Sequence, residues 1–166
     1  MTPWIYKNEL DFEVPTGAFG FVYKIEYIGP KSSSITKTKY IGRKYLTASK
    51  TVSKRVSKKD GTKTLKKKKS RVESQWRDYR GSCKPLLQDI EKFGMENYRF
   101  EILAFAQTKG QVNMMEEFCQ MRAGVLIDDA FYNDSIGARG FIGVKITEEF
   151  KTTLRGIGLW NKNVRK

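Results

Sequence analysis

Tyrosines next to cations are the feature of this sequence best suited to chemistry. The stretch FGFVYKI, residues 19–25, contains Tyr23, and KYIGRK, residues 39–44, contains Tyr40 with two cations close behind it. A tyrosine acts as a general base only if its pKa, near 10 when unperturbed, is lowered or its proton is relayed. Nearby cations lower that pKa by favouring the phenolate. Such tyrosines facing one carboxylate would make a coherent hydrolytic site.

Histidine is absent from the 166 residues, and the formal net charge is +14. The absence excludes Ser-His-Asp hydrolases and histidine-ligated zinc sites. The charge favours a polyanionic partner, most often nucleic acid, over a membrane surface, because no basic amphipathic helix with a bulky apolar face stands out. No apolar run approaches the ~20 residues that span a bilayer. The N-terminus does not read as a signal peptide. We expect a cytoplasmic protein in which Cys83 and Cys119 are buried free thiols.

Two strands should position the tyrosines. Residues 19–28 are rich in β-branched and aromatic side chains, and residues 39–46 form a second short strand. The turn residues between them predict an antiparallel hairpin with a long loop. Tyr-Ile-Gly occurs twice, and the copy that begins at Tyr27 lies on the same strand as Tyr23. Only the copy that begins at Tyr40 can therefore lie beside Tyr23 on a neighbouring strand.

Residues 50–71 form a basic insertion after the second strand. Eleven of these 22 residues are Lys or Arg, and Asp60 is the one acid. With so few large apolar side chains the segment cannot order itself by burial, so we expect it to be mobile unless a partner neutralises it. A solvated linker is the simpler interpretation, but the single sign of charge favours tracking of phosphates. The expected nucleic-acid contacts are Lys54, Arg55, Lys58, Lys59, Lys66, Lys67, Lys68, Lys69, Arg71 and Arg77.

Two helices and a third strand complete the pattern. Apolar residues at helical spacing follow Ser82, a candidate N-cap, and stop at Gly94. A strand is predicted over 97–106. A helix over 111–122 would bury its methionines in the core and end at Gly124. The predicted class is α+β, an α/β sandwich with a small, mostly antiparallel three-stranded sheet flanked by helices.

The order of these pieces resembles the GIY-YIG nuclease family. FGFVYKI and KYIGRK are similar to the two halves of its motif, and WRDYRGSCKPLLQDIEKFGMENYRFEIL is similar to a stretch of stand-alone phage-type members. NMMEEF resembles the helix that carries the family's acidic residue, and FYND resembles its closing Tyr-Asn. The resemblance implies a GIY-YIG-like domain over 18–140 with a basic insertion at about 50–71, between an N-terminal arm, 1–17, and a C-terminal tail, 141–166.

The resemblance also implies roles for particular residues. Glu116 would bind one divalent metal, Mg²⁺ or Mn²⁺, with Glu117 as its competitor. Tyr23 and Tyr40 would position or activate water. Asn133 would be a structural or phosphate-orienting amide. The metal and a cation would then stabilise the charge that develops on the phosphate during hydrolysis.

The family's arginine is the hardest residue to place, because the basic insertion begins where that arginine would follow. Its role could fall to Arg43, to Lys44, or to Arg71 or Arg77 beyond the insertion. Tyr79 could occupy the position where the family has a His or Tyr one helical turn later.

The implied function is a Mg²⁺-dependent endonuclease that cleaves DNA, double-stranded by expectation, to a 5′-phosphate and a 3′-hydroxyl. Phage homing or degradation of host DNA in the host cytoplasm would be its role. A non-catalytic nucleic-acid-binding protein is the alternative, since it needs the charge but not Glu116 near Tyr23 and Tyr40. A phage protein with a protein partner is a third hypothesis, and its binding would not weaken steeply with salt.

Overall fold

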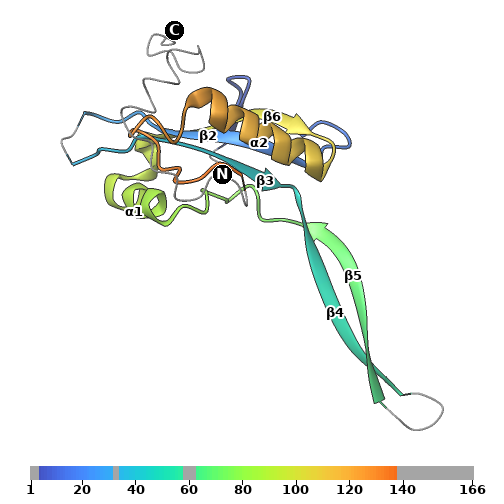
Figure 1. Cartoon of the computed structure of the whole chain (residues 1–166). Coiled ribbons are helices and arrows are strands. Elements are labelled where there is room, and N and C mark those ends of the chain that lie inside the picture. Colours follow the sequence, from blue (N-terminus) through green and yellow to red (C-terminus); the bar gives the residue numbers. More distant parts are fainter. Residues whose placement is uncertain (1–3, 32–33, 58–62, 138–166) are drawn as a thin grey trace.

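Strands and helices follow one another in the order that the sequence predicts, with three further strands. The computed structural model describes residues 4–31, 34–57 and 63–137 (Figure 1). Its elements are β1 (Trp4–Tyr6), β2 (Gly20–Tyr27), β3 (Lys39–Tyr45), β4 (Thr47–Ser57), β5 (Lys63–Glu73), α1 (Lys84–Phe93), the 3-10 turn η1 (Met95–Asn97), β6 (Tyr98–Ala106) and α2 (Lys109–Ala123). The predicted α+β class is confirmed. Among the described helices, none has the length and apolar character needed to cross a membrane.

A four-stranded sheet in the order β1-β6-β2-β3 lies at the centre. β2 is antiparallel to both β3 and β6, whereas β1 is parallel to β6. The helices cover opposite faces of this sheet, with α2 above it and α1 below it in Figure 1. The sequence predicted three strands. The fourth is part of the predicted N-terminal arm, where Trp4 is fixed by a 2.9 Å hydrogen bond from its indole nitrogen to the carbonyl of Trp76.

Two cores form because successive side chains of β2 point to opposite faces. Phe21, Tyr23 and Ile25 pack on the α1 side in an aromatic-rich cluster. Val22, between them, packs on the α2 side. The larger cluster also contains Trp4, Leu46, Trp76, Leu86, Ile90, Tyr98, Phe100, Ile102 and Tyr132, and the smaller one Ile41, Val112, Val125 and Phe131.

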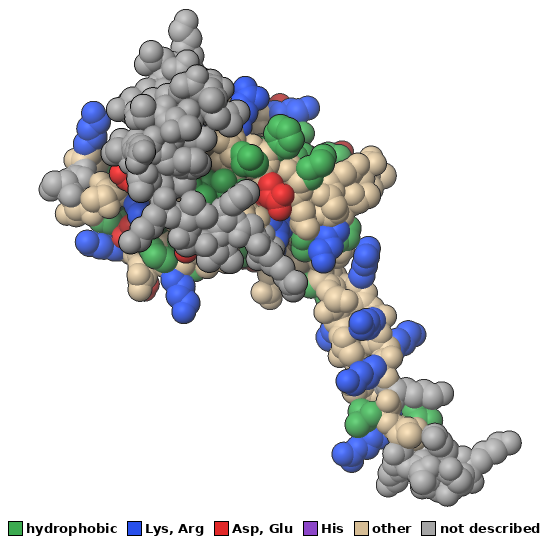
Figure 2. Space-filling view, in the orientation of Figure 1, with side chains coloured by type: hydrophobic (Ala, Val, Ile, Leu, Met, Phe, Trp, Pro, Cys, Tyr) green, Lys and Arg blue, Asp and Glu red, His purple; other side chains and the backbone are tan. Residues whose placement is uncertain are grey.

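The buried face of α2 differs from the prediction that its methionines form the core. Met114 and Met121 are 62% and 61% exposed, and Phe118 is 71% exposed. Of the three methionines in α2, only Met115 packs against the smaller cluster. Buried positions recur instead every four residues and are Val112, Glu116 and Gln120. Two of these are polar, so the buried face of the helix mixes polar side chains with Val112. Hydrophobic side chains are exposed on its outer face, visible as green atoms over α2 in Figure 2.

The start of α1 differs from the predicted N-cap by one residue. Cys83, not Ser82, holds the extended backbone of the N-cap, with φ −75° and ψ 115°, and no side chain caps the helix. Pro85 lies in the first turn, where its missing N–H costs nothing. Gly94 ends the helix as predicted, at φ 87°. Cys83 and Cys119 are both free and partly buried.

The basic insertion is an ordered hairpin, contrary to the prediction of a segment that stays mobile without a partner. β4 and β5 pair antiparallel from Thr47 opposite Glu73 to Ser57 opposite Lys63, and the pair projects away from the central sheet (Figure 1). Backbone hydrogen bonds and β-branched residues along both strands supply order that burial does not. Lys58 and Lys59 lie outside the described residues.

Candidate active site

A pocket of about 560 Å³ opens beside β3, the outermost strand of the central sheet. β3, the start of α1, the middle of α2 and the segment that follows Phe131 all contribute to it. Because β3 is the outermost strand of its sheet, side chains from both of its faces reach the same pocket. The lining residues are Tyr40, Arg43, Ser82, Cys83, Lys84, Pro85, Glu116, Gln120, Tyr132, Asn133, Asp134, Ser135 and Gly137.

Tyr40 lines this pocket from the α1 side of the sheet. The predicted pairing is confirmed, since β2 and β3 are antiparallel with Tyr23 opposite Gly42 and Tyr40 opposite Ile25. The rings of Tyr40 and Tyr23 lie side by side with their centroids 6.1 Å apart. Burial raises the pKa of Tyr40. The expectation that cations lower this pKa is wrong, because desolvation dominates and the opposing contributions are hydrogen bonds with Ser82 and Tyr23.

Tyr23 lies behind Tyr40 and is fully buried in the aromatic core, so it does not line the pocket. Burial raises its pKa well above the ordinary value as well. Its hydroxyl lies against Gly42, where an added Cβ would come within 2.6 Å of that oxygen. Gly42 therefore makes room for the Tyr23 ring.

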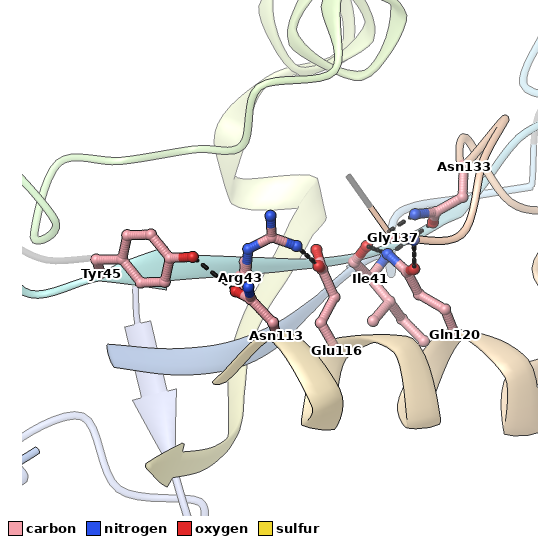
Figure 3. A network of polar contacts seen from close by, with 8 residues as sticks. All are labelled: Ile41, Arg43, Tyr45, Asn113, Glu116, Gln120, Asn133 and Gly137. Carbon is pink, nitrogen blue, oxygen red and sulfur yellow. Dashed lines mark hydrogen bonds and ion pairs between the residues drawn. The ribbon is translucent and has the colours of Figure 1, made fainter. Parts of the chain in front are cut away.

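Arg43 and Glu116 form an ion pair across the α2 side of the sheet (Figure 3). Nη1 of Arg43 donates to Oε2 of Glu116. The Glu116 residue is only 7% exposed, so the guanidinium is what compensates its burial. Next along the same two elements, the Tyr45 hydroxyl lies 2.6 Å from Oδ1 of Asn113. Glu117, the competitor of Glu116, is exposed and does not line the pocket.

Two amides brace the edge of β3 at Ile41. Asn133 accepts from the Ile41 N–H at 3.0 Å and donates to the Ile41 carbonyl at 2.8 Å, so both polar ends of its side chain are engaged by backbone. Gln120 donates to the same carbonyl at 3.1 Å and accepts from the Gly137 N–H at 3.2 Å (Figure 3). Sequence reasoning missed Gln120, although its place one helical turn after Glu116 puts both on one helix face.

Lys44 and Tyr79 lie on the other face of β3 from Arg43. The Lys44 ammonium stacks over the Tyr79 ring at 4.0 Å from its centroid, and burial lowers the pKa of Lys44. Tyr79 in turn packs edge-on against Tyr23, with centroids 6.0 Å apart. Neither residue lines the pocket.

The start of α1 contributes residues that sequence reasoning did not assign to the site. Ser82, Cys83 and Lys84 line the pocket opposite β3. The first N–H groups of a helix have no partner within the helix and attract anions. Lys84 adds a full positive charge at the same end. Their position at the predicted start of the helix is the signal that could have identified them.

The predicted nucleic-acid contacts lie mostly on the hairpin, away from the pocket lining. Lys54 and Arg55 are on β4, and Lys66, Lys67, Lys68, Lys69 and Arg71 are on β5. Arg77 lies at the root of the hairpin, where it pairs with Glu73 and stacks on Trp76. The proposed phosphate contacts and the pocket are thus separate parts of the chain.

One carboxylate in a polar hollow fits a hydrated divalent ion. The described residues contain no group of three His, Cys, Asp or Glu that could hold a metal. Mg²⁺ needs no such cage, since it keeps several waters and binds through one or two carboxylates and a substrate phosphate. Glu116 supplies such a carboxylate to the pocket, and Asp134 lies on its lining. The residues present therefore fit a single Mg²⁺ held mainly by Glu116.

Comparison with protein families gives one match over most of the chain. A family model described as "Putative endonuclease segE, GIY-YIG domain" matches residues 4–136. The matched range runs from β1 to the segment after α2 and includes Tyr40, Arg43, Glu116 and Asn133. Comparisons with curated proteins and with solved structures give no match.

Proposed function

The chain belongs to the GIY-YIG endonuclease family, and on that premise we propose that it is a Mg²⁺-dependent endonuclease acting on double-stranded DNA. Membership makes the domain a nuclease with nucleic acid as substrate. One observation supports the finer proposal: the buried Glu116, its partner Arg43 and the ring of Tyr40 line the same pocket.

Glu116, through a bound metal ion, and the cations around it would hold the scissile phosphate. A Mg²⁺ ion on the Glu116 carboxylate would neutralise phosphate charge and stabilise the leaving 3′-oxygen. Arg43 has further N–H groups in its planar fork to donate to phosphate oxygens. Lys84 and the N–H groups at the start of α1 face the same pocket and would bind the phosphate from the opposite side.

Tyr40 would orient the attacking water. Because burial raises its pKa, the hydroxyl stays protonated at neutral pH. A protonated hydroxyl can accept a hydrogen bond from the attacking water and so hold it in place, without taking its proton. Tyr23, packed behind it, would hold the Tyr40 ring in place without touching the substrate.

The hairpin cations would supply affinity for the DNA backbone with little sequence information. The 5′-phosphate and 3′-hydroxyl products, and a role in phage homing or host-DNA degradation in the host cytoplasm, belong to the same proposal and rest on the family resemblance.

A plasmid-nicking assay tests the proposal. Supercoiled DNA of several sequences is incubated with the protein in Mg²⁺ and, in parallel, in EDTA. We expect nicked or linear DNA only with Mg²⁺, and we expect DNA ligase to reseal the nicks, which requires a 5′-phosphate and a 3′-hydroxyl. Absence of cleavage on every DNA and with every metal, alongside tight binding, would favour the non-catalytic alternative.

A further inference from the structure

The hairpin formed by β4 and β5 carries positive charge on both of its faces. The two strands contain nine Lys or Arg and one acid, Glu73, which lies at the root. Cross-strand partners share a face, so the register assigns each cation to a side. One face presents Lys50, Lys54 and Lys68, and the other presents Arg55, Lys67, Lys69 and Arg71, all exposed.

Nothing within the described protein neutralises these charges along the hairpin. The strands form their own two-stranded sheet, separate from the central one, and Val52 and Leu65 are 52% and 59% exposed. An isolated two-stranded hairpin is marginally stable in water at best. A partner that brings negative charge to both faces would stabilise it.

The presence of charge on both faces of the hairpin distinguishes between two modes of DNA binding. A hairpin lying along one phosphate backbone would need cations on one face only. A hairpin inserted between two backbones, in a groove, would need them on both. Figure 2 shows Lys and Arg side chains on more than one side of the hairpin.

The dimensions of the hairpin fit the major groove. A sheet with its side chains occupies about 10 Å, the distance at which sheets stack face to face. The major groove is about 12 Å wide and the minor groove about 6 Å. Strands of eleven residues extend about 35 Å, close to the rise of one turn of B-DNA.

We propose that the hairpin of β4 and β5 inserts into the DNA major groove, with one cationic face toward each phosphate backbone. The inference rests on the proposed function, because it takes DNA as the substrate. It goes further by assigning the groove and by giving the two faces equal parts in binding.

Three variants of equal charge test the role of the two faces. The first replaces Lys50, Lys54 and Lys68 with Gln, and the second replaces Arg55, Lys67 and Lys69 with Gln. The matched control replaces three exposed lysines away from the hairpin, Lys31, Lys92 and Lys109. Binding to a 30-base-pair duplex in EDTA is measured over a range of salt concentrations.

Both face variants should bind at least about tenfold more weakly at physiological salt and should lower the salt slope by about 2 to 3, since each phosphate contact contributes about 0.9. The control should change affinity by less than about threefold. An effect confined to one face would mean that the hairpin lies on a single backbone. A control as weak as the face variants would mean that only net charge matters. Either result would overturn the inference.

Dimethyl sulfate footprinting tests the groove, because it methylates guanine N7 in the major groove and adenine N3 in the minor groove. We expect protection of guanine N7. The negative control replaces residues 50–70 with Asn-Gly, a turn that can join the cross-strand partners Ser49 and Arg71, and thermal unfolding verifies its fold. Adenine N3 protection, or guanine protection that survives in this control, would contradict groove insertion.

Nicking of the same DNA by the full chain in Mg²⁺ separates the two proposals. Nicking without guanine N7 protection would reject the groove inference and leave the nuclease function standing. Guanine N7 protection without nicking would reject the nuclease function and leave the groove contact standing.

Discussion

Arg43 and Lys44 are adjacent in the chain, yet their side chains lie in different environments. Strand alternation sends Arg43 to Glu116 and the pocket, and Lys44 to the ring of Tyr79. The sequence left both open for the family's arginine role, because residue type alone does not say which face of a strand borders a site. We propose Arg43 for that role, because Arg43 lines the pocket and Lys44 does not.

Replacing each cation in turn with Gln removes one charge from each face of β3 and tests that preference. Arg43→Gln should lower kcat/KM for plasmid nicking by about 100-fold or more, the cost of losing one donor to the charge of a transition state. Lys44→Gln should lower it by less than about tenfold. Thermal unfolding controls for stability, since Arg43 also compensates Glu116. A larger loss for Lys44→Gln would assign the phosphate role to Lys44.

The two Tyr-Ile-Gly copies differ in which tyrosine their glycine accommodates. At Gly29 an added Cβ would come within 2.6 Å of the hydroxyl of Tyr27, in the same copy, and at Gly42 within 2.6 Å of the hydroxyl of Tyr23, on the neighbouring strand. The choice of the second copy as the partner of Tyr23 could be made from the sequence by strand reversal alone. The reason for its glycine could not, because it depends on the register of β2 and β3.

Among the elements, α2 shows why the presence of a helix is easier to predict than its orientation. Its span was predicted to within two residues. A capping box at Thr108 accounts for its start, and Gly124 at the C-cap accounts for its end. Its apolar residues lie on more than one side, so no single stripe marked the buried face. In the structure α2 instead buries Val112, Glu116 and Gln120, and the two polar side chains therefore lie at the pocket.

Stability measurements on two α2 variants test this orientation. Val112→Ala should lower the free energy of unfolding by about 2 kcal/mol, because Val112 is fully buried. Phe118→Ala should change it by less than about 0.5 kcal/mol, although phenylalanine is larger, because Phe118 is exposed. Urea unfolding gives both values. The opposite ranking would mean that the helix buries the side that carries Phe118 instead of Val112.

The hairpin was missed as an element because its charge was given more weight than its backbone preferences. Threonine and valine recur along both strands, at Thr51, Val52, Val56, Thr64 and Val72. Such residues favour extended backbone even where little is buried. The expected phosphate contacts therefore stay a prediction, now carried by a defined hairpin instead of a mobile segment.

Across the whole molecule, four stretches far apart in the chain meet at the edge of β3. They are residues 40–43, 82–85, 116–120 and 132–137. Motif order allowed Tyr40, Arg43, Glu116 and Asn133 to be named from the sequence. It could not show that Tyr23 is buried behind Tyr40, or that the start of α1 faces Glu116, because these relations arise only when the sheet and both helices pack.

Adjacent carboxylates on α2 provide the most direct test of the central claim, that Glu116 is the metal-binding group of a nuclease site. Glu116→Gln and Glu117→Gln are compared with the unchanged chain in the Mg²⁺ nicking assay, at equal DNA binding and thermal stability. Glu116→Gln should lose cleavage, by about 100-fold or more, while Glu117→Gln, exposed and outside the pocket lining, should keep it. Undiminished cleavage by Glu116→Gln, or loss in Glu117→Gln alone, would contradict the account.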